Sequence, residues 1–147
     1  MKRMVITHTI LAAVTVALMA LPFGVNCYYA SPENGGVDFS AVHTVSFFDM
    51  RLFDFQNPLP FVTALAAVAL LALSVWRLTA YTKTLNAVSL GGSALVLVLS
   101  VLPLLLFGTE YYSTVAMTAS FTRLCMAVID LYIVRGKLLY TPKTKSE

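Results

Sequence analysis

Two charged residues lie inside an apolar stretch that is long enough to cross a bilayer. The stretch runs from Ser113 to Val134 and contains Arg123 and Asp130. About 20 apolar residues span the hydrocarbon core, where a charged side chain costs about 2.5–3.5 kcal/mol on insertion scales. We therefore expect one face of this helix to meet protein or water, where its chemistry is charge pairing, hydrogen bonding or proton transfer.

Small and polar residues mark that face of the helix. They recur at alternating intervals of four and three residues, at Ala116, Ser120, Arg123, Ala127 and Asp130, which places them on one side. Arg123 and Asp130 are about 10.5 Å apart along the axis. Because helical side chains lean toward the N-terminus of their helix, Arg123 leans away from Asp130, and the sequence predicts no direct bridge between them.

Three interpretations of this polar face stay open. The favoured one is that both charges bind backbone carbonyls, hydroxyl groups and water inside a bundle; the others are a proton or ion path, or contact with a charged residue of another subunit. His8 should lie at a depth similar to that of Asp130, and a position at the headgroup boundary is favoured there over proton handling or pairing. The hypothetical intramembrane polar face comprises Arg123, Asp130, His8, Ser120, Ser93 and Ser100.

Composition indicates an integral membrane protein. The chain has 147 residues, of which 59% are hydrophobic and 12% charged, well above the roughly 45–50% apolar usage of soluble domains. Links of about six residues or fewer, 79–84 and 108–112, make the last three apolar runs antiparallel neighbours. We expect a single domain with helices over about 4–22, 59–78, 85–107 and 113–134.

The first apolar run also has the outline of a secretory signal peptide. It follows two basic residues, but it is about 17 residues long, its cleavage site at Leu18-Met19-Ala20 is poor, and Pro22 follows directly. A cleavable signal has a shorter apolar region and small residues at the cut. An uncleaved first helix is therefore the favoured interpretation.

The segment 24–57 is the one long polar loop, and its pattern predicts a β-hairpin. Apolar and polar residues alternate over 37–47, as in a half-buried strand, although His43 interrupts the apolar row. Residues 31–36 form a turn cluster, and Val25 to Ala30 supplies the returning strand.

Aromatic residues crowd the end of that loop. The hypothetical loop interface comprises Phe47, Phe48, Phe53 and Phe55, which alternate with charged residues. This composition is typical of the headgroup region, so anchoring at the membrane surface is favoured. The alternative is an aromatic patch for a partner protein or lipid.

Charge placement predicts the orientation. Three segments share one side of the membrane: those before the first helix, between the second and third, and after the fourth. Glu147 is their one acidic residue. Their basic residues are Lys2, Arg3, Arg77, Lys83, Arg135, Lys137, Lys143 and Lys145. The positive-inside rule then places both termini and the tail 135–147 in the cytoplasm and the loop 24–57 outside a cell membrane. An anionic lipid leaflet accounts for the basic tail, so no nucleic-acid partner is expected.

No motif for catalysis, metal binding or cofactor binding occurs in the sequence. Cys27 should lie outside the bilayer and Cys125 near its middle, which argues against a disulfide between them. Neither belongs to a Cys-x-x-Cys pair, and His-Glu-x-x-His, Gly-x-Ser-x-Gly and phosphate-loop patterns are missing. The sequence therefore predicts no enzyme, no metal and no cofactor.

The chain resembles uncharacterised small four-helix membrane proteins of Gram-positive bacteria. The resemblance rests on the positively flanked first helix, on Phe47-Phe48-Asp49, and on Pro60-Phe61-Val62-Thr63-Ala64 at the start of the second helix. It implies no activity. The layout is also similar to that of claudins, but their Trp and paired-Cys signature is missing from residues 24–57, and the first-helix glutamate of small multidrug exporters is missing as well.

These observations predict an all-α membrane protein, an antiparallel four-helix transmembrane bundle with a small extracytoplasmic β-hairpin between helices 1 and 2. The expected function is that of a non-catalytic accessory or interaction protein. Its partners would be the lipid bilayer and either further copies of the chain or another membrane protein. The alternative is a small oligomeric transporter or channel subunit that uses the intramembrane Arg, Asp and His face.

Overall fold

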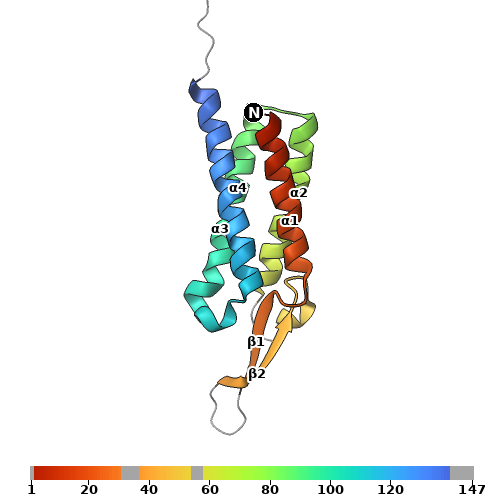
Figure 1. Ribbon diagram of the computed structural model, residues 1–147, viewed down its shortest axis with the longest axis vertical. Coiled ribbons are helices and arrows are strands. Elements are labelled where there is room, and N and C mark those ends of the chain that lie inside the picture. Colours follow the sequence, from red (N-terminus) through yellow and green to blue (C-terminus); the bar gives the residue numbers. More distant parts are fainter. Residues whose placement is uncertain (1, 31–36, 54–57, 140–147) are drawn as a thin grey trace, which may run out of the picture.

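Four long helices lie side by side, and a two-stranded hairpin extends from one end of them (Figure 1). The computed structural model describes residues 2–30, 37–53 and 58–139. All four helices are long and apolar enough to cross a membrane, so the predicted four helices and hairpin are confirmed. In chain order the elements are α1 (Lys2–Ala20), β1 (Val25–Ala30), β2 (Val37–Val45), η1 (Met50–Phe53), α2 (Leu59–Thr79), α3 (Lys83–Phe107), η2 (Thr109–Tyr111) and α4 (Thr114–Leu139).

The helices form a ring in which each one packs against two neighbours. α1 contacts α2 and α4, and α3 contacts the same two helices on the other side. Consecutive helices run in opposite directions, so the start of α1 lies at the opposite end from the hairpin (Figure 1). We call these two ends of the bundle the N-terminal end and the hairpin end.

Local sequence signals account for the helix boundaries. Thr82 precedes α3 and its hydroxyl accepts a hydrogen bond from the Leu85 amide at 3.2 Å, so this helix begins two residues earlier than expected. It ends at Gly108, whose φ of 87° favours glycine. Ser113 accepts a bond from the Ala116 amide at 3.0 Å and caps α4 in the same way.

Two other helices end at different residues than the sequence predicts. α1 ends at Ala20, where Pro22 follows two residues later. α4 continues to Leu139, five residues beyond the expected end at residue 134. The exposed Arg135 lies within this extension. A charged residue ends the apolar stretch without ending the helix, because Arg has a high helix propensity.

The hairpin has the two predicted strands, with an irregular register. Val25 pairs with Val45 and Tyr28 with Val42, but Tyr29 then pairs with Asp38, so β2 bulges between these pairs. At the base of the hairpin Val25, Cys27 and Val45 are buried, whereas Val42 and His43 are exposed. Among the β2 residues whose burial is described, Val45 thus lies on the covered face, and His43 interrupts that face as the sequence predicts. The predicted turn at 31–36 lies outside the described residues.

The aromatic residues after β2 belong to the core, which corrects the expectation of a surface anchor. The Phe47 side chain is only 5% exposed, and Phe48 packs against the same buried cluster. The Phe47 amide donates to the Met19 carbonyl at 3.0 Å and so joins the hairpin to the end of α1. The side chain of Phe53 and all of Phe55 lie outside the described part of the chain.

Further hydrogen bonds hold the base of the hairpin against the start of α4. The Ser113 hydroxyl donates to the Gly24 carbonyl at 2.6 Å, and Val25 forms an isolated bridge with Tyr112. The Tyr28 hydroxyl and the Asn26 side-chain amide both donate to the Glu110 carbonyl. The hairpin is therefore connected to both α1 and α4.

Gly24 provides the space that the Phe47 ring occupies. A Cβ atom at Gly24 would lie 2.6 Å from Phe47 Cδ2, whereas a Cβ atom at Gly91 in α3 would meet nothing within 4 Å. We expect Gly24→Ala to lower the unfolding free energy by about 1–3 kcal/mol, the usual cost of overpacking. Gly91→Ala should leave it unchanged or raise it, because alanine is the better helix former. Thermal unfolding in detergent measures both, and equal effects would contradict the packing role of Gly24.

Candidate functional site: a buried charge cluster

Asp130 of α4 is the centre of a polar cluster that involves all four helices. Its side chain is completely buried. Oδ1 accepts a hydrogen bond from Arg77 Nη1 at 2.7 Å. Oδ2 accepts from the hydroxyl groups of Ser89 and Ser93, each at 2.8 Å, and lies 3.0 Å from His8 Nε2. Three of these four groups therefore meet Oδ2 and one meets Oδ1, so both oxygens of the carboxylate are engaged by the protein.

Arg77, near the end of α2, is the cation that pairs with Asp130. Its side chain is 1% exposed, and its Nη1 also donates to Ser89. Nε and Nη2 donate to Oδ1 of Asn86 at 3.3 and 3.1 Å. Asn86 Nδ2 has no hydrogen-bond partner among the described residues. The Arg77–Asp130 pair is therefore surrounded by several hydrogen-bond donors.

His8 joins α1 to the cluster. Its ring is fully buried, with Nδ1 3.0 Å from the Ser74 hydroxyl and Nε2 3.2 Å from the Ser93 hydroxyl. Because Nε2 faces a carboxylate oxygen of Asp130, Nε2 must carry a proton. His8 is therefore paired inside the bundle, which was the alternative to a histidine at the headgroup boundary. We call the set His8, Ser74, Arg77, Asn86, Ser89, Ser93 and Asp130 the Asp130 cluster.

Helical periodicity explains why these side chains converge. In α3 the residues Asn86, Ser89 and Ser93 recur at intervals of three and four and share one buried face. In α2 the same spacing runs from Leu70 through Ser74 to Arg77. Short polar side chains let the helices approach closely and supply hydroxyl groups to the one carboxylate between them.

A buried apolar layer separates the Asp130 cluster from the hairpin half of the bundle. Its residues lie on the same helix faces, one turn closer to the hairpin end, and each is 4% exposed or less. The layer consists of Ala12, Ala67, Leu70, Val96 and Met126, all members of one hydrophobic cluster. Polar groups on its two sides are therefore not continuous through the bundle.

Arg123 lies beyond this layer, in the hairpin half, and it has few partners. The side chain is 1% exposed. Nη2 donates to the Met19 sulfur, and the guanidinium lies 5.9 Å from the centre of the Phe47 ring. Nε and Nη1 have no acceptor within the described part of the chain. As the sequence predicts, Arg123 and Asp130 form no bridge; the expected hydroxyl partners are found at Asp130, and among the described residues no hydroxyl or carbonyl bonds to Arg123.

Two serines of the predicted polar face also lie in the hairpin half. The Tyr112 hydroxyl donates to the Ser100 carbonyl at 3.0 Å and bonds to the Ser120 hydroxyl. Of the six predicted polar-face residues, the structure thus brings together His8, Ser93 and Asp130. The other three, Arg123, Ser120 and Ser100, belong to the opposite half.

Comparison of the chain with protein-family models, curated proteins and solved structures gives no match. The chemistry of the candidate site therefore rests on its own geometry. One carboxylate that meets a guanidinium, an imidazole and two hydroxyls joins all four helices.

The predicted polar face did not include four members of this cluster, Ser74, Arg77, Asn86 and Ser89, and Arg77 is the charged one among them. Its position beside Trp76, at the end of an apolar run, suggested an interfacial base. The signal that identifies it is the buried stripe of α2, because Thr63, Leu70, Ser74 and Arg77 all fall on one face. A residue that continues such a stripe faces the bundle even when it lies near the end of the helix.

Other reactive groups of the described chain do not add a second site. Both cysteines are free, and burial raises the pKa of the Cys27 thiol to about 11. Two hydrogen bonds from Arg51 lower the pKa of Asp49. Among the described residues no group of three His, Cys, Asp or Glu side chains is placed to hold a metal ion.

The two buried arginines provide a matched pair for a stability test. Arg77→Met removes the guanidinium opposite Asp130 and leaves a buried carboxylate, which typically costs about 3–5 kcal/mol. Arg123→Met removes a guanidinium whose neighbours are a thioether and an aromatic ring, so we expect equal or higher stability. The free energy of unfolding in detergent measures both effects.

A rescue variant separates charge from packing. Asp130→Asn in the Arg77→Met background removes the unpaired charge and should restore part of the lost stability. A loss of similar size in Arg77→Met and Arg123→Met would contradict the difference between the two sites.

Proposed function

We propose that the chain is a four-span protein of the cell membrane with both termini in the cytoplasm and the hairpin outside. Four helices of suitable length and hydropathy support insertion. Arg77 is buried and no longer counts among the exposed basic residues of the N-terminal end. Lys2, Arg3 and Lys83 are exposed there, and by the positive-inside rule they favour a cytoplasmic location for this end. At the hairpin end Arg51 pairs with Asp49.

Single cysteines in a variant without Cys27 and Cys125 test this orientation. Thr44→Cys and Glu110→Cys lie at exposed positions of the hairpin end, Arg3→Cys and Lys83→Cys at exposed positions of the N-terminal end. In intact cells an impermeant thiol reagent should label the first two and should label the last two only after lysis. Labelling of Lys83→Cys alone in intact cells would reverse the orientation.

We further propose that the protein is a non-catalytic accessory or interaction protein. The observation that carries this proposal is that the polar groups of the Asp130 cluster are bonded to one another and are separated from Arg123 by the apolar layer. Ion or proton conduction requires polar groups or water along the whole path. Near the hairpin a cavity between Phe47, Thr63 and Tyr112 has a volume of about 10 Å³, which is room for one water at most.

The hairpin is the part of the molecule best placed to meet a partner outside the membrane. It projects beyond the helices (Figure 1), while its base is hydrogen-bonded to α1 and α4. The Val42 side chain is 46% exposed on β2. A hairpin held by a stiff bundle loses little freedom when it binds, which favours association. The partner is either a second copy of the chain or another membrane protein.

Two measurements test the interaction proposal against the transporter alternative. A photo-crosslinking residue at Val42, on the hairpin, should give specific adducts in native membranes, whereas the same residue at Val98 on α3, which is 60% exposed, should give mainly lipid adducts. Purified protein in vesicles should carry no proton or ion flux above that of empty vesicles. Flux that is lost in Asp130→Asn would overturn the proposal, and so would identical crosslinking at the two positions.

A further inference from the structure

A cavity opens at the N-terminal end of the bundle, between the start of α1 and the end of α2. Its volume is about 190 Å³, and its lining comprises Lys2, Val5, Arg77, Leu78 and Tyr81. A single water needs about 10–15 Å³, so the cavity has room for a much larger group. Two of its five lining residues are cationic, none is acidic, and Val5 and Leu78 give it apolar walls.

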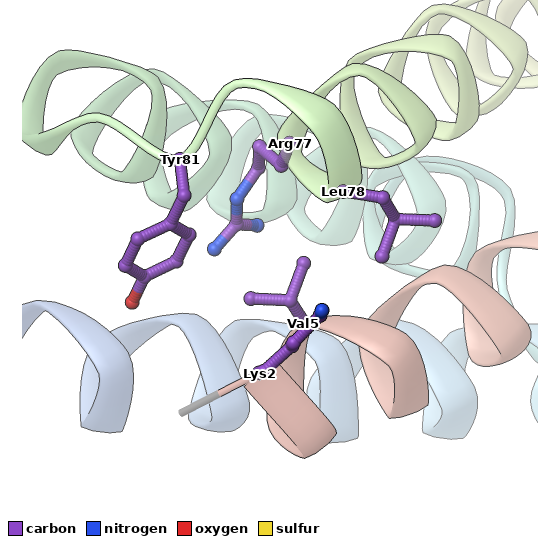
Figure 2. A pocket seen from close by; sticks show the side chains of 5 residues that line it. All are labelled: Lys2, Val5, Arg77, Leu78 and Tyr81. Atoms are coloured by element: carbon purple, nitrogen blue, oxygen red, sulfur yellow. The ribbon is translucent and has the colours of Figure 1, made fainter.

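The guanidinium of Arg77 points into this cavity. Figure 2 shows it reaching from α2 between Tyr81 and Leu78 toward Val5 of α1. A guanidinium has five N–H groups. The two on Nη1 donate to Ser89 and Asp130, and Nε and Nη2 each donate one N–H to Oδ1 of Asn86. One N–H of Nη2 therefore has no acceptor among the described residues, although Arg77 is 1% exposed.

Asn86, which accepts from Arg77, also has unpaired donors among the described residues. Its Oδ1 is occupied by Arg77, and its buried Nδ2 has no partner in the described part of the chain. Buried donors almost always have an acceptor in native proteins. Among the described residues, the donors around Arg77 therefore outnumber the acceptors, which favours a ligand with acceptor oxygens in the adjoining cavity.

The start of α1 makes the mouth of the cavity more positive. The helix begins at Lys2 and carries no acidic residue in its first turn, and its positive dipole end meets the negative end of α2 across the cavity. Arg77 is paired with Asp130, so among the described residues Lys2 supplies the unpaired charge at the mouth and Arg77 supplies a hydrogen-bond donor. An anion at the mouth would meet the Lys2 ammonium, the first turn of α1 and the remaining Arg77 donor together.

We propose that this cavity binds the phosphate group of an anionic phospholipid. The phosphate oxygens accept from Arg77 and Lys2, and the glycerol and upper acyl carbons contact Val5 and Leu78. The apolar walls favour a lipid over a free phosphate, because a free phosphate gains nothing from them. In the proposed orientation the cavity faces the cytoplasmic leaflet, where basic pockets between helices bind anionic headgroups.

The binding test uses the full-length protein purified in a neutral detergent. Native mass spectrometry measures the apparent affinity for phosphatidylglycerol and for phosphatidylcholine with identical acyl chains. We expect at least fivefold preference for phosphatidylglycerol. Lys2→Gln should weaken phosphatidylglycerol binding about fivefold, the effect of one basic residue near an anionic headgroup. Arg3→Gln is the matched control, because it removes the same charge next to Lys2 but does not line the cavity.

A second variant tests the cavity itself without altering charge. Val5→Phe fills the space between Lys2 and Leu78 and should also reduce the phosphatidylglycerol preference at least fivefold, provided that its thermal unfolding matches that of wild type. Val14→Phe, at an exposed position on the same helix, should leave the preference unchanged. If the Val5→Phe variant unfolds at a lower temperature than wild type, the Leu78→Ala variant is used in its place. Leu78→Ala removes part of the apolar wall of the cavity without filling the cavity, and it should lower the phosphatidylglycerol preference in the same way.

Glycerol phosphate and inorganic phosphate distinguish the two sources of the phosphate. Neither should displace phosphatidylglycerol at millimolar concentration if the apolar walls contribute as proposed. Displacement by either would overturn the assignment to a lipid and assign the cavity to a soluble phosphate. Equal binding of the two lipids, or equal effects of Lys2→Gln and Arg3→Gln, would overturn the site altogether and assign the unpaired donors to water. The cavity lies at the opposite end from the hairpin, so these outcomes do not depend on the hairpin partner.

Discussion

The fold depends on the neutralisation of one carboxylate that is buried at the centre of the bundle. Asp130 is fully buried among four helices, and each of the other three sends it a donor: His8 from α1, Arg77 from α2, and Ser89 and Ser93 from α3. Dispersion packing between apolar helices in lipid is weakly directional. The carboxylate adds direction, since only one rotation of each helix brings its donor to the centre.

The same constraint explains why the two halves of the bundle differ. The Asp130 cluster contains its own counter-charge, whereas Arg123 is surrounded by the Met19 thioether and the Phe47 ring. Phe47 comes from the segment after β2, so the hairpin supplies part of the surroundings of Arg123. The Arg77–Asp130 pair stabilises the N-terminal half of the bundle, whereas the segment after β2 covers the buried arginine of the hairpin half.

The helices and strands were predictable from the sequence because their signals are local. Apolar length, Thr82, Gly108 and the alternation before Val45 identify elements without knowledge of the fold. The polar face of α4 was also predictable, since it depends on spacing within one helix. Its partners were not all predictable, because a pairing between helices depends on their rotation.

Arg77 and Phe47 illustrate that limit. Both lie next to the ends of apolar runs and have the composition of a membrane boundary, where Arg and Phe are common at the surface. Their burial follows from tertiary contacts: Arg77 meets a carboxylate 53 residues away, and Phe47 fills the space above Gly24. The stripe of α2 indicates that Arg77 faces the bundle, but the local pattern identifies the partner of neither residue.

The distance in sequence between Arg77 and Asp130 has a consequence for synthesis of the protein. A ribosome makes α1, α2 and α3 before α4, so the nascent chain carries His8 and Arg77 before their carboxylate exists. Three helices without the fourth therefore hold a cation that they cannot neutralise. The bundle closes only when its last helix arrives, and a chain that is truncated before Asp130 keeps an arginine without its counter-charge.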